Sequence, residues 1–83
     1  MSLSPVRLLC CGDVQTAPRR FRDAGLEVVV LQAGVSPEQL AAVAVQEDVA
    51  LVAVTDPELG ALAVGALDDH VVVFWITSDS RPS

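Results

Sequence analysis

Residues 25–56 constrain the fold more than any other part of this 83-residue chain. They read GLEVVVLQAGVSPEQLAAVAVQEDVALVAVTD, so that two Val-rich runs flank a stretch with helical spacing. The letters SPEQ, which begin at Ser36, form a helix start. Ser36 can cap the first turn, Pro37 suits the first helical position, and Gln39 completes a capping box. The segment therefore predicts a strand, a helix and a second strand in close succession.

The rest of the chain continues this alternation. Short apolar runs predict strands at residues 6–11, 26–32, 49–54 and 71–76. The intervening stretches predict helices at residues 17–24, 36–48 and 56–66, each with a proline in its first turn, where the missing N–H costs little. In the last of these helices, one apolar stripe at i, i+3, i+4 and i+7 is expected to face inward: Leu59, Leu62, Ala63 and Ala66.

Strands that alternate with helices form βαβ units, whose crossovers are right-handed. We therefore expect one α/β domain over residues 1–83, with an ordered core of about residues 5–77. The expected architecture is three-layered and flavodoxin-like (Rossmann-like), with a four-stranded parallel sheet of order 2-1-3-4. The residues expected in its buried core are Leu9, Val28, Val30, Val52, Val54 and Val73.

Such a sheet has a preferred place for ligands. They bind beyond the carboxyl ends of the strands, at the switch point between strands one and three. In this chain the expected crevice lies between residues 12–16 and 55–58, which contain Asp13, Asp56 and Glu58. Three carboxylates there repel a phosphate and attract a cation. Asp56 and Glu58 are also favourable at a helix N-terminus on electrostatic grounds alone.

The charge of the chain argues against some classes of partner. The net charge is −6, lysine is absent, and all five cations are arginines. This balance argues against a nucleic-acid partner, since phosphate binding needs a positive surface. We interpret the cluster Arg19, Arg20 and Arg22 as a solvated helix face. No apolar run reaches the length of a membrane span, and the first seven residues carry no signal-peptide pattern, so we expect a cytoplasmic protein without membrane contacts.

Residues 22–28, which read RDAGLEV, and residues 36–54 resemble a cobalamin-binding domain of the methylmalonyl-CoA mutase type. As a likeness in fold, the resemblance extends over residues 6–76. The family has the motif DxHxxG after its first strand, and the histidine of that motif ligates cobalt. Here Asp13 matches the motif, but Gln15 stands at the position of the histidine and Pro18 at that of the glycine.

The other signatures of this family are also altered. Its Ser-rich turn after strand three corresponds to Thr55 and Asp56, and its Gly-Gly pair after strand four corresponds to Thr77 and Ser78. Its fifth strand and last helix have no counterpart here. The resemblance implies a degenerate cofactor crevice formed by Asp13, Gln15, Thr16, Thr55, Asp56 and Thr77. We therefore expect no cofactor, no metal and no catalytic residue. The predicted function is a binding or assembly module, with a role accessory to a mutase-like enzyme as one option.

Two other functions remain open. The receiver domain of response regulators shares this architecture, and its site corresponds here to Asp13, Asp56 and Thr77, with Asp56 as the phosphoacceptor; a second acid and a lysine are missing. Phosphotransfer IIB proteins place a nucleophilic cysteine where this chain has Cys10 and Cys11, although Asp13 disfavours a thiolate nearby. Adjacent strand residues point to opposite faces, so these cysteines are not expected to bond to each other.

Residues 71–76 are the segment at which a partner is expected. They read VVVFWI, end the predicted sheet, and contain neither proline nor lysine to prevent edge pairing. Phe74 and Trp75 point to opposite faces, and each is expected to bury its ring in an interface. We predict a homodimer or a protein partner, bound through Val71, Val73, Phe74 and Trp75. His70, the single histidine, precedes this strand at the end of the sheet opposite the crevice, so a metal-ligand role is not expected.

Overall fold

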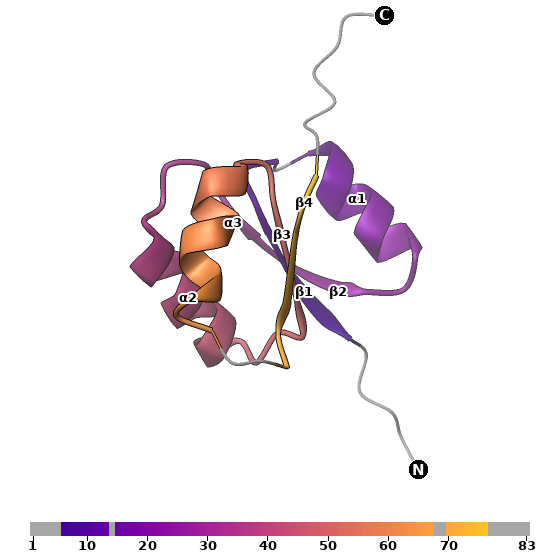
Figure 1. Cartoon of the computed structure of the whole chain (residues 1–83). Helices are drawn as coiled ribbons and strands as arrows, with labels where there is room; N and C mark the ends of the chain where they lie inside the picture. The colour runs from indigo at the N-terminus through magenta and orange to yellow at the C-terminus, as the bar shows by residue number, and fades with distance from the viewer. Residues whose placement is uncertain (1–5, 14, 68–69, 77–83) are drawn as a thin grey trace, which may run out of the picture.

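The computed structural model describes residues 6–13, 15–67 and 70–76, which form a parallel sheet with helices on both faces (Figure 1). The strands are β1 (Arg7–Cys11), β2 (Glu27–Leu31), β3 (Leu51–Val54) and β4 (Val72–Trp75). The helices are α1 (Thr16–Asp23), α2 (Pro37–Gln46) and α3 (Pro57–Val64). The strand order is β2-β1-β3-β4 and all pairs are parallel, which confirms the expected flavodoxin-like fold class.

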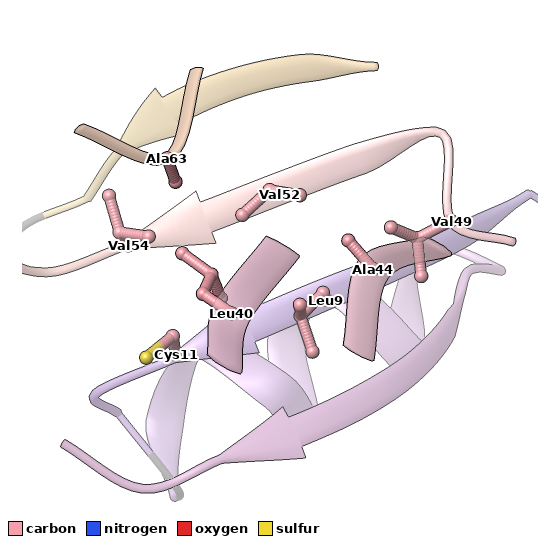
Figure 2. Packing of buried hydrophobic residues seen from close by; sticks show 8 residues of the cluster. All are labelled: Leu9, Cys11, Leu40, Ala44, Val49, Val52, Val54 and Ala63. Carbon is pink, nitrogen blue, oxygen red and sulfur yellow. The ribbon is translucent and has the colours of Figure 1, made fainter. Parts of the chain in front are cut away.

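The sheet separates two apolar layers, because successive side chains of a strand point to opposite faces. On one face, Leu9 and Cys11 of β1 pack against α2 and α3 (Figure 2). On the other face, Leu8 and Cys10 pack with Ala17 and Phe21 of α1. Figure 1 shows α1 on the side of the sheet opposite α2 and α3. Two helices therefore cover the first face and one helix of eight residues covers the second. The α1 face is the more thinly covered of the two.

The central strands carry the buried core. The residues expected there from β1 and β3 are at most 1% exposed, and they are Leu9, Val52 and Val54. The same expectation is wrong for Val28, Val30 and Val73, which are only half-buried. These three belong to β2 and β4, the outer strands, and each outer strand has one neighbour instead of two. Apolar composition does not separate outer from central strands in this chain, since all four are rich in Val or Leu.

Local hydrogen bonds fix both ends of α2. The expected capping box is present: the Ser36 hydroxyl accepts from the N–H of Gln39 at 3.1 Å, and the Ser36 N–H donates to the Gln39 side chain at 2.9 Å. The helix ends at Gln46, two residues earlier than predicted. Asp48 adopts a left-handed conformation with φ of 53°, and its N–H donates to the carbonyl of Val45 at 3.2 Å. This closing turn directs the chain into β3.

The packing of α3 differs from the predicted stripe. Ala63 is buried as expected, but Leu62 is 58% exposed, and the helix ends before Ala66. Gly60 is buried instead, and a Cβ at this position would lie 2.8 Å from Cγ2 of Val54. The missing side chain of Gly60 therefore lets α3 approach β3 closely, and this contact sets which face of the helix is buried.

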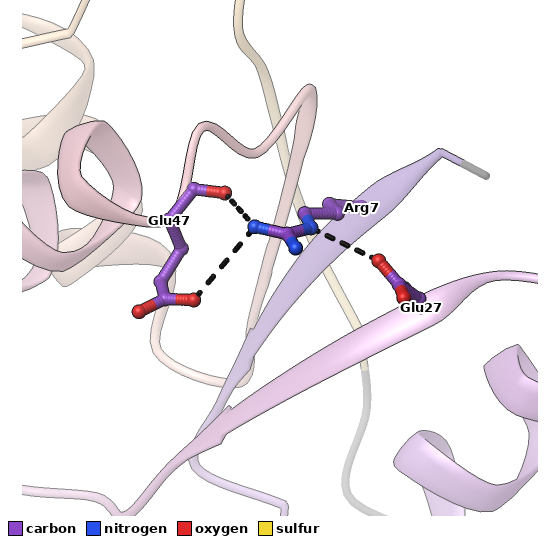
Figure 3. A network of polar contacts seen from close by, with 3 residues as sticks. All are labelled: Arg7, Glu27 and Glu47. Atoms are coloured by element: carbon purple, nitrogen blue, oxygen red, sulfur yellow. Dashed lines mark hydrogen bonds and ion pairs between the residues drawn. The ribbon is translucent and has the colours of Figure 1, made fainter. Parts of the chain in front are cut away.

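Arg7 connects three elements at the amino end of the sheet (Figure 3). Its Nε donates to Oε2 of Glu27 on β2 at 2.9 Å, and its Nη1 donates to the carbonyl of Glu47 after α2 at 2.9 Å. Both carboxylates raise the pKa of Arg7, chiefly that of Glu27. These groups are exposed, so the cluster positions the strand ends without adding much to stability.

Candidate functional site

The carboxyl ends of β1 and β3 form the region where the sequence predicts a crevice. Gly12, which follows β1, has φ of +107°, and a Cβ on this residue would overlap Oγ1 of Thr55. The N–H of Thr55 donates to the carbonyl of Cys11 at 3.2 Å, which holds the two loops together. The side chain of Thr55 thus occupies the space that a side chain on residue 12 would take.

Asp13 has a structural role at the start of α1. The residue is 9% exposed, and its carboxylate accepts three backbone N–H groups, those of Gln15 at 2.9 Å, Thr16 at 3.0 Å and Ala17 at 3.2 Å. These bonds, above all that of Gln15, lower the pKa of Asp13. Because Asp13 satisfies the N–H groups of the first turn, α1 offers no free N-terminus to an anion. An aspartate shortly before a helix is compatible with such a cap as well as with a ligand role, so the sequence alone does not predict this cap.

Asp56 caps α3 in the same way, although it is exposed. Its Oδ1 accepts from the N–H of Glu58 at 3.0 Å, in agreement with the electrostatic interpretation of this pair. The structure thus brings Asp13, Gln15 and Thr16 together at the start of α1. Thr55 and Asp56 lie at the end of β3. The remaining predicted site residue, Thr77, and its neighbour Ser78 lie outside the described residues.

The two cysteines are buried on opposite faces of the sheet and do not bond to each other, as expected. Burial is the main reason that the pKa of Cys10 rises to about 11, and it also raises the pKa of Cys11. Sγ of Cys10 lies 3.5 Å from the carbonyl oxygen of Asp13. A thiol with a raised pKa and no access to solvent is a poor nucleophile, which disfavours the phosphotransfer interpretation.

A groove of about 460 Å³ lies between α1 and β4. Its aromatic wall contains Phe21 of α1, and Phe21 packs edge to face on Phe74 of β4 with ring centroids 6.3 Å apart. Apart from Asp13, its ionisable residue is Arg20, one of the three arginines of α1. Within the described part of the chain, only Arg7 forms ion pairs, so the interpretation of the α1 arginines as a solvated face is consistent with the structure.

The outer edge of β4 carries unpaired backbone groups. The N–H groups of Val72 and Ile76 donate to carbonyls of the β3 segment, at 3.0 and 2.7 Å. Because backbone groups alternate in direction along a strand, the N–H and C=O groups of Val73 and Trp75 point away from the sheet. No strand within residues 6–13, 15–67 and 70–76 pairs with them.

The side chains around this edge are apolar and exposed. Val72 is 55% exposed and Trp75 is 68% exposed, whereas Phe74 is half-buried. On the α3 face, a groove of about 110 Å³ separates β4 from α3, and every residue that lines it is apolar or glycine: Val54, Pro57, Gly60, Ala61, Val64, Val73, Phe74 and Trp75. The edge predicted to bind a partner is therefore an apolar part of the described surface that also has unpaired backbone groups.

Comparison with models of known families and with curated protein sequences gives no match to this chain. The described residues contain no group of three or more His, Cys, Asp or Glu side chains placed to hold a metal ion. His70 is an exposed turn residue before β4. Among the helices of the described segments, none has the length and apolar content that a membrane crossing requires.

Proposed function

We propose that this chain is a non-catalytic binding and assembly module that associates through the outer edge of β4. The observation that carries the proposal is Trp75, whose large side chain is 68% exposed next to outward-pointing backbone groups. A long apolar edge without charges is a template for further strand pairing. An exposed aromatic residue beside it is typical of an interface anchor.

We propose a non-catalytic module because the carboxylates of Asp13 and Asp56 and the two thiols are hydrogen-bonded to the backbone or buried. The carboxylate of Asp13 is committed to three backbone hydrogen bonds, and that of Asp56 caps α3. The thiols of Cys10 and Cys11 are buried, and their pKa values are raised. These groups stabilise the fold, so no described cluster combines a nucleophile with a base.

In this proposal the chain resembles the cobalamin-binding domain of methylmalonyl-CoA mutase, but it does not bind cobalamin through a histidine. Gln15 offers an amide where the motif has an imidazole, and Pro18 stands at the position of the motif's glycine. A role accessory to a mutase-like enzyme is included as one use of such a module. A cytoplasmic location belongs to the same proposal, because unbridged cysteines suit a reducing compartment.

A receiver-like signalling role with Asp56 as phosphoacceptor is the alternative. The exposure of Asp56 after β3 favours it, while the absence of lysine from the chain removes the usual partner of an acyl phosphate. Incubation with a small-molecule phosphodonor such as acetyl phosphate and Mg²⁺, followed by intact-mass measurement, separates the two proposals. A phosphate adduct that disappears in Asp56→Asn would favour the receiver, and an unmodified mass would favour the assembly module.

Sedimentation velocity of Trp75→Lys tests the assembly module directly. The matched control is Val45→Lys, because Val45 is 66% exposed but lies on α2 rather than on the β4 edge. We expect the wild-type chain and Val45→Lys to associate to the same extent, alone or with a candidate partner, and Trp75→Lys to associate more weakly. Equal association of all three proteins would contradict a role for the β4 edge.

A further inference from the structure

We infer that the partner at the β4 edge is a second copy of this chain, paired antiparallel to β4 about a two-fold axis at Val73. This inference rests on the proposed function and specifies which partner binds the β4 edge. The two four-stranded sheets then become one continuous sheet. Since a two-fold axis perpendicular to a sheet keeps each face on its own side, both copies of α3 lie on the same face.

The backbone directions limit the possible registers. Antiparallel pairing requires that outward-pointing residues face one another, and the outward-pointing residues at this edge are Val71, Val73 and Trp75. Centring the axis on Val73 pairs Val71 with Trp75 of the second copy. In this register, the whole uncharged stretch from Val71 to Trp75 is paired with itself, and no described charged residue enters the ladder.

The same register covers the exposed side chains of β4. Val72, which is 55% exposed, comes opposite Phe74 of the second copy on the α1 face. Trp75, which is 68% exposed, comes opposite Val71 of the second copy. Because side chains alternate along β4 and Phe74 packs on the α1 face, Trp75 leaves the strand on the α3 face, as Val71 and Val73 do. Each copy thus supplies the apolar neighbour that the other lacks. Directly opposite pairs of this aromatic and β-branched type are the ones that stabilise a sheet.

The surface of α3 has the matching shape. Pro57, Ala61 and Val64 line the α3–β4 groove at i, i+4 and i+7, so they form one stripe that points toward the sheet edge. α3 runs antiparallel to the strands, so its two copies meet as antiparallel helices (Figure 1). Val64, which is 53% exposed, then lies near Trp75 of the second copy, and the small side chain of Ala61 lies near the axis.

The charge of the chain predicts how the stability of this dimer depends on salt. The paired stretch is uncharged, while each chain carries a net charge of −6, so the two copies repel each other at long range. Added salt screens this repulsion, and the dimer should therefore become tighter as salt increases. A head-to-tail contact of the arginines of α1 with acidic residues elsewhere would become weaker instead. The uncharged β4 edge favours the antiparallel dimer over this head-to-tail contact.

Disulfide trapping of the full chain tests the register. In an antiparallel pair centred on Val73, the two Cα atoms of residue 73 are about 5.5 Å apart, which is within the range of a disulfide. The Cα atoms of residue 72 are about 8 Å apart, which is beyond that range. Val73→Cys should therefore form a covalent dimer under mild oxidation. Val72→Cys is the control, because it is more exposed and would cross-link more readily in random collisions.

The outcomes separate the inference from the proposed function. A covalent dimer of Val73→Cys, without one of Val72→Cys, supports the inference, provided that salt strengthens the association of the wild-type chain. Equal cross-linking of both variants overturns the register. A dimer that salt weakens overturns the uncharged β4 edge as its interface. A chain that stays monomeric up to millimolar concentration overturns the second copy as partner. The proposed function fails on a separate result, namely that Trp75→Lys weakens neither self-association nor binding to any other protein.

Discussion

Thr55 lies against Gly12 so closely that a Cβ on residue 12 would overlap its hydroxyl oxygen. This contact joins the loops after β1 and β3 at the place where flavodoxin-like sheets usually receive a ligand. It also explains why residue 12 is glycine. The residue combines φ of +107° with a backbone that touches a neighbouring side chain.

Substitution of Gly12 should therefore destabilise the protein more than the left-handed backbone alone requires. We expect Gly12→Ala to lower the free energy of unfolding by more than the roughly 1–2 kcal/mol of a left-handed alanine. Gly34→Ala is the control, because Gly34 has φ of +97° but no neighbouring atom within 4 Å of the place that a Cβ would take. Urea unfolding measures both. Equal losses in the two variants would show that the Thr55 contact has no energetic effect.

The carboxylate of Asp13 should stabilise the fold through its hydrogen bonds to α1. We expect Asp13→Ala to lower the free energy of unfolding by about 1–2 kcal/mol near pH 7, as for the loss of a helix cap. Asp56→Ala is the comparison, and its loss should be smaller because Asp56 is exposed and accepts one such bond.

The stabilisation by Asp13 should also depend on pH. Because folding lowers the pKa of Asp13 from its ordinary value of 3.8, its contribution is complete above that value and is lost as pH falls through the folded pKa. Unfolding curves of the wild type and Asp13→Ala should therefore converge below about pH 4. A constant difference between them down to pH 2 would contradict this role of the carboxylate.

Cobalamin should not bind with a nitrogen ligand from this chain. Gln15 supplies an amide in place of imidazole, and Pro18 and Thr77-Ser78 stand where the family has glycines. The absorption spectrum of added cobalamin should therefore stay that of the free compound. Gln15→His should behave like the wild type, because the substitution restores the ligand while Pro18 still stands at the position of the motif's glycine. A spectral shift typical of histidine ligation in the unmodified protein would refute this prediction.

The stripe on α3 gives a test of the dimer that leaves β4 intact. Val64 and Leu62 are similarly exposed, at 53% and 58%, but only Val64 lines the groove next to β4. We expect Val64→Lys to weaken dimerisation by at least tenfold, since it buries two ammonium groups in the interface, while Leu62→Lys leaves the dissociation constant nearly unchanged. Analytical ultracentrifugation over a range of concentrations measures both. Weakening by Leu62→Lys alone would place the interface on a different side of α3.

Most of the fold could be predicted from the sequence, because strands and helices alternate with clear boundaries. The capping box at Ser36 and the apolar runs predict the elements along the chain, and the right-handed crossover of βαβ units then limits the strand order to a few choices, one of which is the observed order. The sequence does not predict which face of α3 is buried, since this depends on the close approach of Gly60 to Val54, a contact between separate elements. It also does not show that Asp13 turns inward to cap α1, because a loop aspartate is equally compatible with a ligand role.

Amide hydrogen exchange at the β4 edge tests whether two copies of this chain pair through that edge. The N–H groups of Val73 and Trp75 point away from the sheet, while that of Phe74 points toward β3 and serves as an internal control. We predict that exchange at Val73 and Trp75 slows as protein concentration rises and the dimer forms, while Phe74 is protected at every concentration. Fast exchange at Val73 and Trp75, unchanged from micromolar to millimolar protein, would contradict self-pairing of this edge.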